Sequence, residues 1–316
     1  MRANTLIQAY ERMALIRAYE NTVVSLAGQH RLPGTCTSIG QEASAVGVVS
    51  ALSSDDLILT NHRSAGHLLA RGADPARMLA EVMGKSGGYC GGKSGSLHIS
   101  SKELGVVLTS TIVGGELSLV TGVALARTML GQAGVVACFF GDGAACQGRF
   151  HESLNLAAVW KLPILYVCEN NQWQAFVHRQ ETMLADGVVG HAAGHGIGGS
   201  RVDGMDVEAV REAAEHAISR IRETGAPHLL EVMTYRLRGH FEPDDQAYVD
   251  PAELARWRAR DPLVLLRRRL IESGMADEAD LDRIDVEVGV RLDRAVGVAD
   301  ASPYPERREL TSDVYA

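Results

Sequence analysis

Two short polar segments each follow an apolar run of the sequence, and their residue types suit metal and phosphate chemistry. Gly141-Asp142-Gly143 follows VVACFF (135–140), and Asn170-Asn171 follows LPILYVCE (162–169). Continuous apolar runs of this length are typical of parallel strands buried on both faces. The carboxyl ends of such strands meet at one edge of a sheet, where α/β proteins bind ligands. We therefore expect Asp142 and Asn171 to lie close together at that edge.

The oxygen atoms of these side chains favour magnesium. Magnesium prefers hard oxygen ligands and usually takes one or two carboxylates together with phosphate oxygens. The glycines on either side of Asp142 let a phosphate approach the backbone, and amides at the start of the next helix can receive its charge. A glycine turn and an unrelated asparagine turn are the alternative interpretation. The spacing of 29 positions between Asp142 and Asn171, which fits one crossover helix and one strand, favours the site.

The segments around these residues have the patterns of an α/β protein. RFHESLNLAAVWK, between the two apolar runs, predicts a crossover helix, and the resulting βαβ unit predicts a parallel sheet with helices on both faces. LILT (57–60) and HLLEVMTYRL predict further strands. Helical spacing occurs in four further segments: residues 4–28, GQEASAVGVVSAL with its small residues, ELSLVTGVALARTML, and DVEAVREAAEHAISRIRE, which Asp206 should cap.

We expect one α/β domain over residues 1–316. Its expected parts are an N-terminal helical segment (1–55), a sheet core (56–236), and a loop with two charged C-terminal helices (237–316). Residues 172–200 are glycine-rich and are expected to be irregular. His191 and His195 within them have a metal-compatible spacing but no third ligand nearby, so a solvated loop is expected.

The composition excludes several classes of protein. It is 46% hydrophobic and 22% charged, which is ordinary for a globular protein, and the net charge of −8 without a basic stripe disfavours nucleic acid as a partner. No window approaches about 20 apolar residues, and the first residues do not resemble a signal peptide, so no membrane span is expected. The five cysteines include no C-x-x-C pair, which favours reduced thiols and a cytoplasmic location.

GGYCGGKS (87–94) fits the G-x-x-x-x-G-K-S pattern of nucleotide-binding loops. That pattern requires a strand before it and a helix after it. Here a segment with helical spacing, LAEVMGK, precedes it and GSLHISSK follows, so we do not expect it to bind a nucleotide.

The segment GDGAACQGRFHESLNLAAVWKLPILYVCENN (141–171) closely resembles the thiamine diphosphate motif in the alpha subunits of 2-oxo acid dehydrogenases of the pyruvate and acetoin dehydrogenase type. Five further segments resemble that family in the same order along the chain: GQEASAVGVVSAL, LTNHRSAGHLLARG, GGYCGGKSGSLHI, RVDGMDVEAV and EVMTYRLRGH. The resemblance implies the thiamine-diphosphate-binding fold, a parallel sheet with helices on both faces plus helical extensions. It also implies an oxidoreductase with thiamine diphosphate and Mg²⁺ as cofactors.

The resemblance assigns the metal and diphosphate contacts to particular residues. Asp142, the side chain of Asn171 and the backbone carbonyl of Trp173 would bind Mg²⁺. The diphosphate would be held by the remaining contacts, which are the amides of Gly143 and Ala144, the guanidinium of Arg63, and His62.

The resemblance also assigns residues to the rings of the cofactor. Thr111 and Val113 would meet the aminopyrimidine through their backbones. His240 would be the catalytic residue, a proton donor or acceptor beside the thiazolium ring and the substrate.

The sequence departs from the family at several places. Cys36 stands where many members have a histidine, and Phe241 where the animal pyruvate enzymes have a regulatory serine. Gly115-Glu116-Leu117-Ser118 replaces a proline-containing stretch. Glu116 has two interpretations, a helix N-terminal acid or a residue near the aminopyrimidine, and the helix dipole favours the first.

Partners and substrate also follow from the resemblance. In this family a beta subunit supplies the glutamate that activates the aminopyrimidine, so a beta subunit, an α2β2 heterotetramer and a lipoyl-bearing acyltransferase component are implied. The segment from Gly239 to Gln246 is more similar to acetoin dehydrogenases than to the pyruvate or branched-chain enzymes. The expected reaction cleaves the carbon–carbon bond next to the carbonyl of a 2-oxo acid or acetoin and passes the acyl fragment to a lipoyl carrier.

Three other functions would share some of these sequence features. A thiamine-diphosphate-dependent carboligase, acyloin-forming or transketolase-like, would share the cofactor and the beta subunit. A non-catalytic scaffold subunit would have lost the site, which the presence of Asp142, Asn171, Arg63 and His240 argues against. A nicotinamide-dependent dehydrogenase is disfavoured because Gly141-Asp142-Gly143 lacks the third glycine of that fingerprint.

Overall fold

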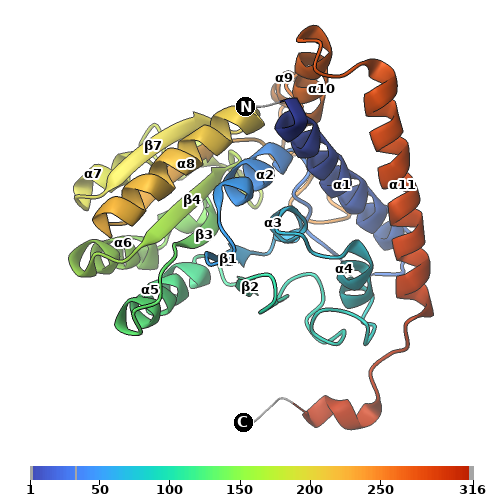
Figure 1. The fold of residues 1–316 in the computed structure, drawn as a ribbon, viewed down its shortest axis with the longest axis horizontal. Coiled ribbons are helices and arrows are strands. Elements are labelled where there is room, and N and C mark those ends of the chain that lie inside the picture. The colour runs from blue at the N-terminus through green and yellow to red at the C-terminus, as the bar shows by residue number, and fades with distance from the viewer. Residues whose placement is uncertain (1–2, 33, 313–316) are drawn as a thin grey trace.

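The computed structural model of the chain describes residues 3–32 and 34–312. A parallel sheet of six strands forms its centre, in the order β2-β1-β3-β4-β8-β7 (Figure 1). In chain order the strands are β1 (Leu57–Asn61), β2 (Val106–Ser110), β3 (Val136–Gly141), β4 (Ile164–Asn170), β7 (Gly198–Asp203) and β8 (His228–Met233). The expectation of an α/β fold with a parallel sheet is confirmed.

Side chains of the central strands alternate between two apolar cores, because successive residues of a strand point to opposite faces. On β3, Ala137 and Phe139 face one core, while Cys138 and Phe140 face the other. The strands are therefore buried on both sides, as their continuous apolar sequences predict.

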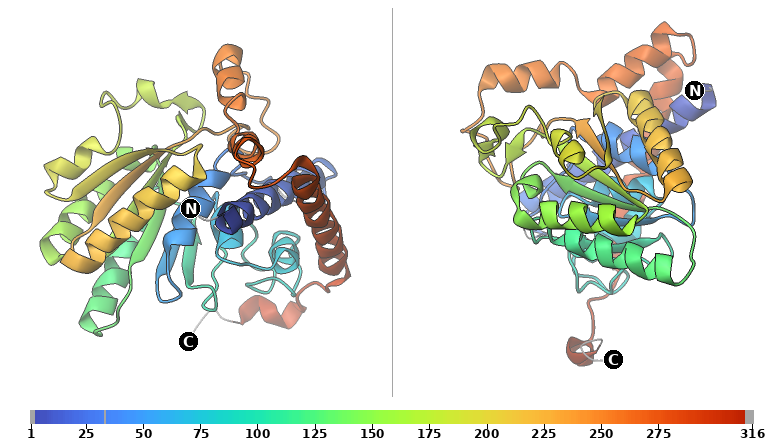
Figure 2. Two further views of the ribbon diagram at one scale, coloured as in Figure 1. Left: turned by 45° about the horizontal axis from the view of Figure 1, so that its top comes forward. Right: turned by 90° about the vertical axis from the view of Figure 1, so that its left-hand side faces the viewer.

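Helices cover both faces of the sheet (Figure 1, Figure 2). The first core contains residues of α1 (Ala3–Gly28), α2 (Glu42–Ala51) and α8 (Val207–Thr224). The second contains residues of α5 (Gly115–Met129) and α6 (Gly148–Trp160). The Asp206 side chain caps α8 by accepting from the amides of Glu208 and Ala209, as expected.

The small residues of α2 allow this helix to pack closely against α8. A Cβ atom at Gly47 would lie 2.6 Å from Cγ1 of Val210, so this glycine permits the close approach of α2 to α8. Close contact of a helix with its neighbour is what the sequence of α2 predicts.

Several elements differ from the expectations. Within the described residues, three α-helices follow residue 250 instead of the two expected helices: α9 (Pro251–Arg258), α10 (Pro262–Glu272) and α11 (Glu278–Ala301). A short 3-10 helix, Arg307–Thr311, comes after them, and α11 packs along α1 and α4 (Pro75–Val82). The prediction of two was wrong because α9 ends at Arg258 and Asp261 caps a new helix that begins at Pro262, within a sequence that stays rich in charged residues.

Residues 172–200 are more regular than expected. They form a hairpin of β5 (Trp173–Gln174) and β6 (Val177–His178), the short helix α7 (Gly190–Gly194) and the start of β7. His191 belongs to α7, and its ring centroid lies 5.1 Å from that of His151 in α6, so this histidine does not lie in a solvated loop.

The glycine-rich loop that fits the nucleotide pattern is filled by the protein itself. The buried carboxylate of Glu81 in α4 accepts bonds from the amides of Cys90 (2.7 Å), Gly92 (3.0 Å) and Ser94 (2.8 Å). A carboxylate already occupies the place where these amides would receive a phosphate, which agrees with the sequence argument against nucleotide binding.

Within the described part of the chain, no helix combines the length and apolar composition that a membrane crossing requires.

Candidate active site

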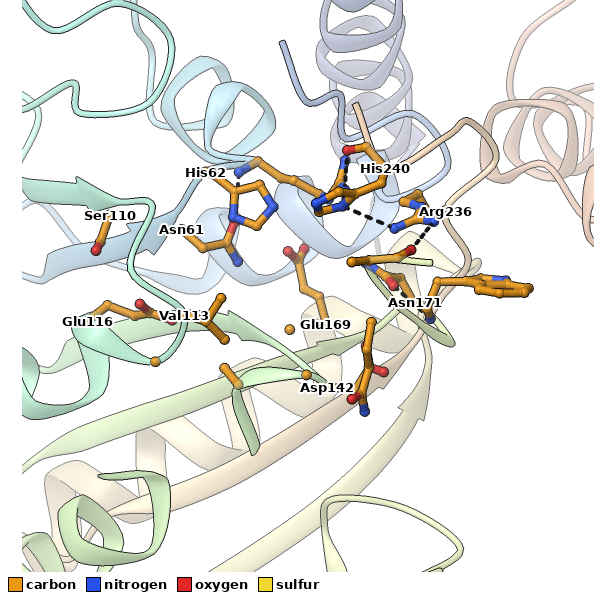
Figure 3. Close-up of a pocket in the computed structure, with 18 of the residues that line it drawn as sticks. Asn61, His62, Ser110, Val113, Glu116, Asp142, Glu169, Asn171, Arg236 and His240 are labelled. Atoms are coloured by element: carbon orange, nitrogen blue, oxygen red, sulfur yellow. Dashed lines mark hydrogen bonds between the residues drawn. The ribbon is translucent and has the colours of Figure 1, made fainter. Parts of the chain in front are cut away.

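A cavity of about 240 Å³ lies at the carboxyl edge of the sheet, beyond the ends of β1, β3 and β4 (Figure 3). Loops after β2 and β8 complete its wall. Its volume is below the 300–1,000 Å³ of most small-molecule sites.

Asp142 follows β3 directly and lines this cavity. It is 1% exposed, and neither carboxylate oxygen has a hydrogen-bond partner among the described residues. Burial raises the pKa of this carboxyl to about 6. The Gln174 side chain, the backbone amides of Asp142 and Asn171, and the positive charge of Arg179 offset only part of the rise. An unpaired buried carboxylate is costly, so a cation in the cavity would stabilise it.

The turn after β4 brings Asn171 and Trp173 to the same cavity. The Asn171 side chain is held at both ends, because its Nδ2 donates to Oε1 of Gln41 (2.9 Å) and its Oδ1 accepts from the Trp173 amide (3.1 Å). Gln172 between them has a φ of +71°, a left-handed conformation that turns the chain sharply. Asp142 and Asn171 thus line one cavity, as their spacing predicts.

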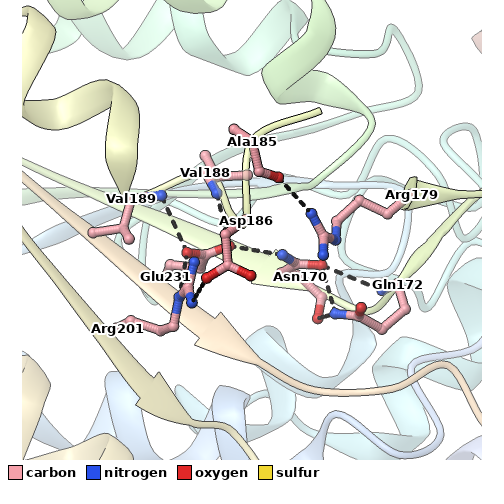
Figure 4. Close-up of polar contacts among 9 residues, drawn as sticks. All are labelled: Asn170, Gln172, Arg179, Ala185, Asp186, Val188, Val189, Arg201 and Glu231. Atoms are coloured by element: carbon pink, nitrogen blue, oxygen red, sulfur yellow. Dashed lines mark hydrogen bonds and ion pairs between the residues drawn. The ribbon is translucent and has the colours of Figure 1, made fainter. Parts of the chain in front are cut away.

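A buried carboxylate behind this turn fixes its position (Figure 4). Glu231 of β8 accepts from Asn170 Nδ2 (2.7 Å), the Val188 amide (2.8 Å), the Val189 amide (3.1 Å) and Arg201 Nε (2.9 Å). All four donors bond to the carboxylate of Glu231, which lies on the inner strand β8. The asparagine turn is therefore tied to the sheet and to the segment before α7.

Two buried arginines, Arg63 and Arg236, bring positive charge to the cavity, and Arg236 lies near Asn171 (Figure 3). The guanidinium of Arg63 donates to the carbonyls of Thr37 (2.6 Å) and His240 (2.8 Å), and that of Arg236 to the Ala175 carbonyl (2.8 Å). Burial lowers the pKa of both, that of Arg236 to about 10, with Arg63 adding repulsion, yet both remain charged at neutral pH. Arginine pairs held in this way attract phosphate groups.

The environment of His240 determines which of its ring nitrogens carries hydrogen. Its Nδ1 lies 3.2 Å from Nη2 of Arg63 and 3.5 Å from Nη1 of Arg236. Burial first, and then these two positive charges, lower the pKa of His240 to about 4, so the ring is neutral at pH 7. Guanidinium groups have donors only, so Nδ1 must be the acceptor and the ring hydrogen resides on Nε2.

His62 lines the cavity next to these groups, with its ring centroid 6.0 Å from that of His240. Its Nε2 is buried without a partner among the described residues. Burial, followed by the charge of Arg63, lowers its pKa to about 3. A neutral imidazole with a vacant nitrogen is available to a ligand.

At the end of β2 and in the loop after it, some residues line the cavity and others do not. Val113 lines the cavity, and so do Ser110 and Ile112, whereas Thr111 between them does not. The Thr111 hydroxyl lies instead 3.4 Å from Nε2 of His98. The expected contact of Thr111 through its backbone stays a prediction.

Sequence reasoning missed some residues of the cavity, among them Glu169 and Arg236. Glu169 accepts from the Ser44 hydroxyl (2.6 Å) and lies 3.2 Å from Nε2 of His67. A charge inside an otherwise apolar strand sequence was the available signal, because buried carboxylates need partners. Glu116, expected at a helix start, is in the first turn of α5 and also lines the cavity.

The cavity fits a magnesium diphosphate on its own chemistry. Asp142 supplies an unpaired carboxylate, Asn171 and Trp173 supply further oxygens, and Gly141 and Gly143 carry no side chain that would block the backbone. Among the described residues, no group of three or more His, Cys, Asp or Glu side chains is arranged to hold a metal. A magnesium site with one carboxylate, an amide and phosphate oxygens does not need such a group.

Comparisons with known proteins agree with this chemistry. The family model described as dehydrogenase E1 component matches residues 10–308. The chain is 42% identical over 313 residues to the alpha subunit of acetoin:2,6-dichlorophenolindophenol oxidoreductase from Cupriavidus necator, covering 98% of this chain and 94% of the relative. The subunit of the same name from Bacillus subtilis is 41% identical over 308 residues, with 97% and 92% covered. The pyruvate dehydrogenase E1 component subunit alpha of Rhizobium meliloti is 39% identical over 310 residues, with 98% and 89% covered.

A parallel sheet with a cavity at its carboxyl edge, lined by Asp142, Asn171 and two buried arginines, is the arrangement of an α/β protein that binds a ligand at that edge. The chain belongs to the dehydrogenase E1 component family. This membership confirms the expectation of an alpha subunit of a thiamine-diphosphate-dependent dehydrogenase, an oxidoreductase of the acetoin and pyruvate dehydrogenase type. Similarity to alpha subunits also implies a beta subunit as partner.

Proposed function

We propose that this chain holds the magnesium and diphosphate of thiamine diphosphate, and that a beta subunit completes the site in an α2β2 heterotetramer. The observation that carries the proposal is the buried carboxylate of Asp142, without a partner among the described residues, in a cavity it shares with Asn171 and Trp173. Mg²⁺ would bind the Asp142 carboxylate, the Asn171 side-chain oxygen and the Trp173 carbonyl.

The anion would occupy the remaining polar part of the cavity. The amides of Gly143 and Ala144 begin a short helical turn, and Arg63 and His62 face the same space. Arg63 and Arg236 together offset the negative charge of a diphosphate. Burial strengthens these contacts, because charges interact more strongly where water is excluded.

His240 is the catalytic residue of this proposal. When bound, thiamine diphosphate supplies an electron sink for the carbon–carbon cleavage. The neutral His240 ring would direct its Nε2 hydrogen at the substrate oxygen, where negative charge develops during the reaction. Burial and the two arginines at Nδ1 keep the ring neutral, and the arginines fix its tautomer, so His240 would act as a hydrogen-bond donor through Nε2.

The proposed substrate is acetoin or a 2-oxo acid such as pyruvate, since relatives with both names cover nearly the whole chain. The acyl fragment would pass to a lipoyl-bearing acyltransferase component. A cytoplasmic location would suit such an assembly.

The test uses the chain co-expressed with its beta subunit. Calorimetric titration with thiamine diphosphate should show binding that requires Mg²⁺, and Asp142→Ala should abolish it. Turnover is then measured with acetoin, pyruvate and branched 2-oxo acids, with 2,6-dichlorophenolindophenol as the electron acceptor. A folded complex that binds no thiamine diphosphate would refute the proposal.

A further inference from the structure

Besides Asp142 and Glu169, a third buried carboxyl lines the cavity, on the side away from Asn171 and Arg236. Glu116 lies beside Ser110 and Val113 in Figure 3, in the first turn of α5. Its side chain is 1% exposed, and its Oε2 has no hydrogen-bond partner among the described residues. Burial raises the pKa of this carboxyl to about 7, although its own backbone amide and the charge of Arg149 counteract the rise.

The helix start does not explain this residue. An acid in the first turn of a helix contributes roughly 0.3–1 kcal/mol when it is exposed. A buried polar group left without a partner costs about 1–3 kcal/mol, which is more than the helix dipole returns. The balance changes if a ligand in the cavity bonds to the carboxyl.

The chemistry around Glu116 indicates which part of a ligand its carboxyl would contact. The arginines and Asp142 lie on the sides suited to phosphate and metal. Near Glu116 the cavity is lined by the apolar side chains of Ile112 and Val113, which are 63% and 52% exposed and therefore open to contact with a flat ring, and by Ser110. A neutral carboxyl suits a heterocycle with an amino group next to a ring nitrogen. Its hydroxyl donates to the nitrogen while its carbonyl accepts from the amino group.

We propose that Glu116 is a cofactor-contacting residue, whose carboxyl forms this paired hydrogen bond with the aminopyrimidine ring of thiamine diphosphate. The inference rests on the proposed function, and it adds a side-chain contact to the backbone contacts expected of Thr111 and Val113.

Binding of two ligands tests the proposal. The complex with the beta subunit is titrated with thiamine diphosphate and with inorganic diphosphate, each with Mg²⁺. Glu116→Ala should weaken thiamine diphosphate binding about tenfold, and leave the binding of inorganic diphosphate within twofold of the parent complex. Glu116→Gln should restore most of the loss, because an amide also donates and accepts at once. Glu152→Gln, an exposed acid of α6, is the matched control and should change neither.

An analogue of thiamine diphosphate without the 4′-amino group identifies the contact. It should bind the parent complex more weakly, and Glu116→Ala should cost it much less than it costs thiamine diphosphate. Equal losses for thiamine diphosphate and inorganic diphosphate in Glu116→Ala, no loss at all, or a Glu116→Gln variant as weak as the alanine variant would each overturn the proposal. If the parent complex binds inorganic diphosphate but not thiamine diphosphate, the proposed function fails as well.

Discussion

Replacing Asp142 by asparagine should make the free chain more stable while it abolishes metal-dependent cofactor binding. The substitution keeps the shape of the side chain and removes its charge. In the structure the carboxyl is buried and has no partner among the described residues, so the native state carries an electrostatic penalty whenever this group is ionised.

The pKa gives the size and sign of this penalty. Burial raises the pKa from 3.8 to about 6, so the native state retains its proton to a higher pH than the unfolded chain does. Stability therefore falls as the pH rises from about 4 to 6, and the whole penalty, about 3 kcal/mol, is present above that range. Asparagine cannot ionise, so Asp142→Asn should gain roughly 1–3 kcal/mol at pH 8 and about half as much at pH 5.

Thermal unfolding of the free chain at pH 8 and pH 5, without Mg²⁺, measures the gain, and calorimetry of the complex with the beta subunit measures the binding. We expect a melting temperature several degrees above that of the parent chain at pH 8. We also expect that Mg²⁺ no longer affects thiamine diphosphate binding. A less stable variant at pH 8, or one that still binds the cofactor through Mg²⁺, would refute the argument that Asp142 is retained for a cation.

Three further changes test other parts of the structure. Glu231→Gln places an amide against donors and should cost about 2–4 kcal/mol in urea unfolding, while weakening Mg²⁺-dependent cofactor binding in calorimetry through the loosened asparagine turn. His228 is buried, and burial lowers its pKa to about 4, so the native state takes up its proton at a lower pH than the unfolded chain does. The free energy of unfolding should therefore fall as the pH drops from 6.5 to 4, and His228→Gln should remove about 1–2 kcal/mol of the fall measured between pH 7 and pH 5. Gly47→Ala should separate α2 from α8 and cost about 1–3 kcal/mol in thermal unfolding, whereas Gly122→Ala in α5, where a Cβ would meet nothing within 4 Å, should be neutral or stabilising; equal effects of the two would contradict the packing argument.

The inner strands of the sheet could be predicted from the sequence, while the edge strands could not. β3 and β4 are continuous apolar runs because both of their faces are covered. β7 (Gly198–Asp203) lies at the edge, and its residues GGSRVD are largely exposed or half-buried, so the sequence has no apolar pattern to detect. β2 (Val106–Ser110), at the other edge, was missed for a different reason: its short apolar sequence, VVLTS, lies within a glycine-rich region that was interpreted as a loop.

The candidate site divides in a similar way. Asp142 and Asn171 end consecutive strands, so their meeting follows from local pattern and the rules of parallel sheets. Arg236 reaches the cavity from the loop after β8, and its hydrogen bond to the Ala175 carbonyl joins positions 61 residues apart. No local periodicity encodes such contacts. Glu116 illustrates a third case, because its position in a helix could be predicted but its burial against the cavity could not.

The loop of residues 87–94 has a wider consequence, because its amides bind a carboxylate of the protein itself. Its amides converge as if on a phosphate, but the carboxylate they receive is that of Glu81, six residues before the first glycine of the pattern. Amides of a sequence pattern that binds nucleotides elsewhere here hold the loop to the helix α4. An acidic residue on a helix that precedes such a pattern therefore predicts, from sequence alone, that the loop amides bind the protein's own carboxylate and not a phosphate.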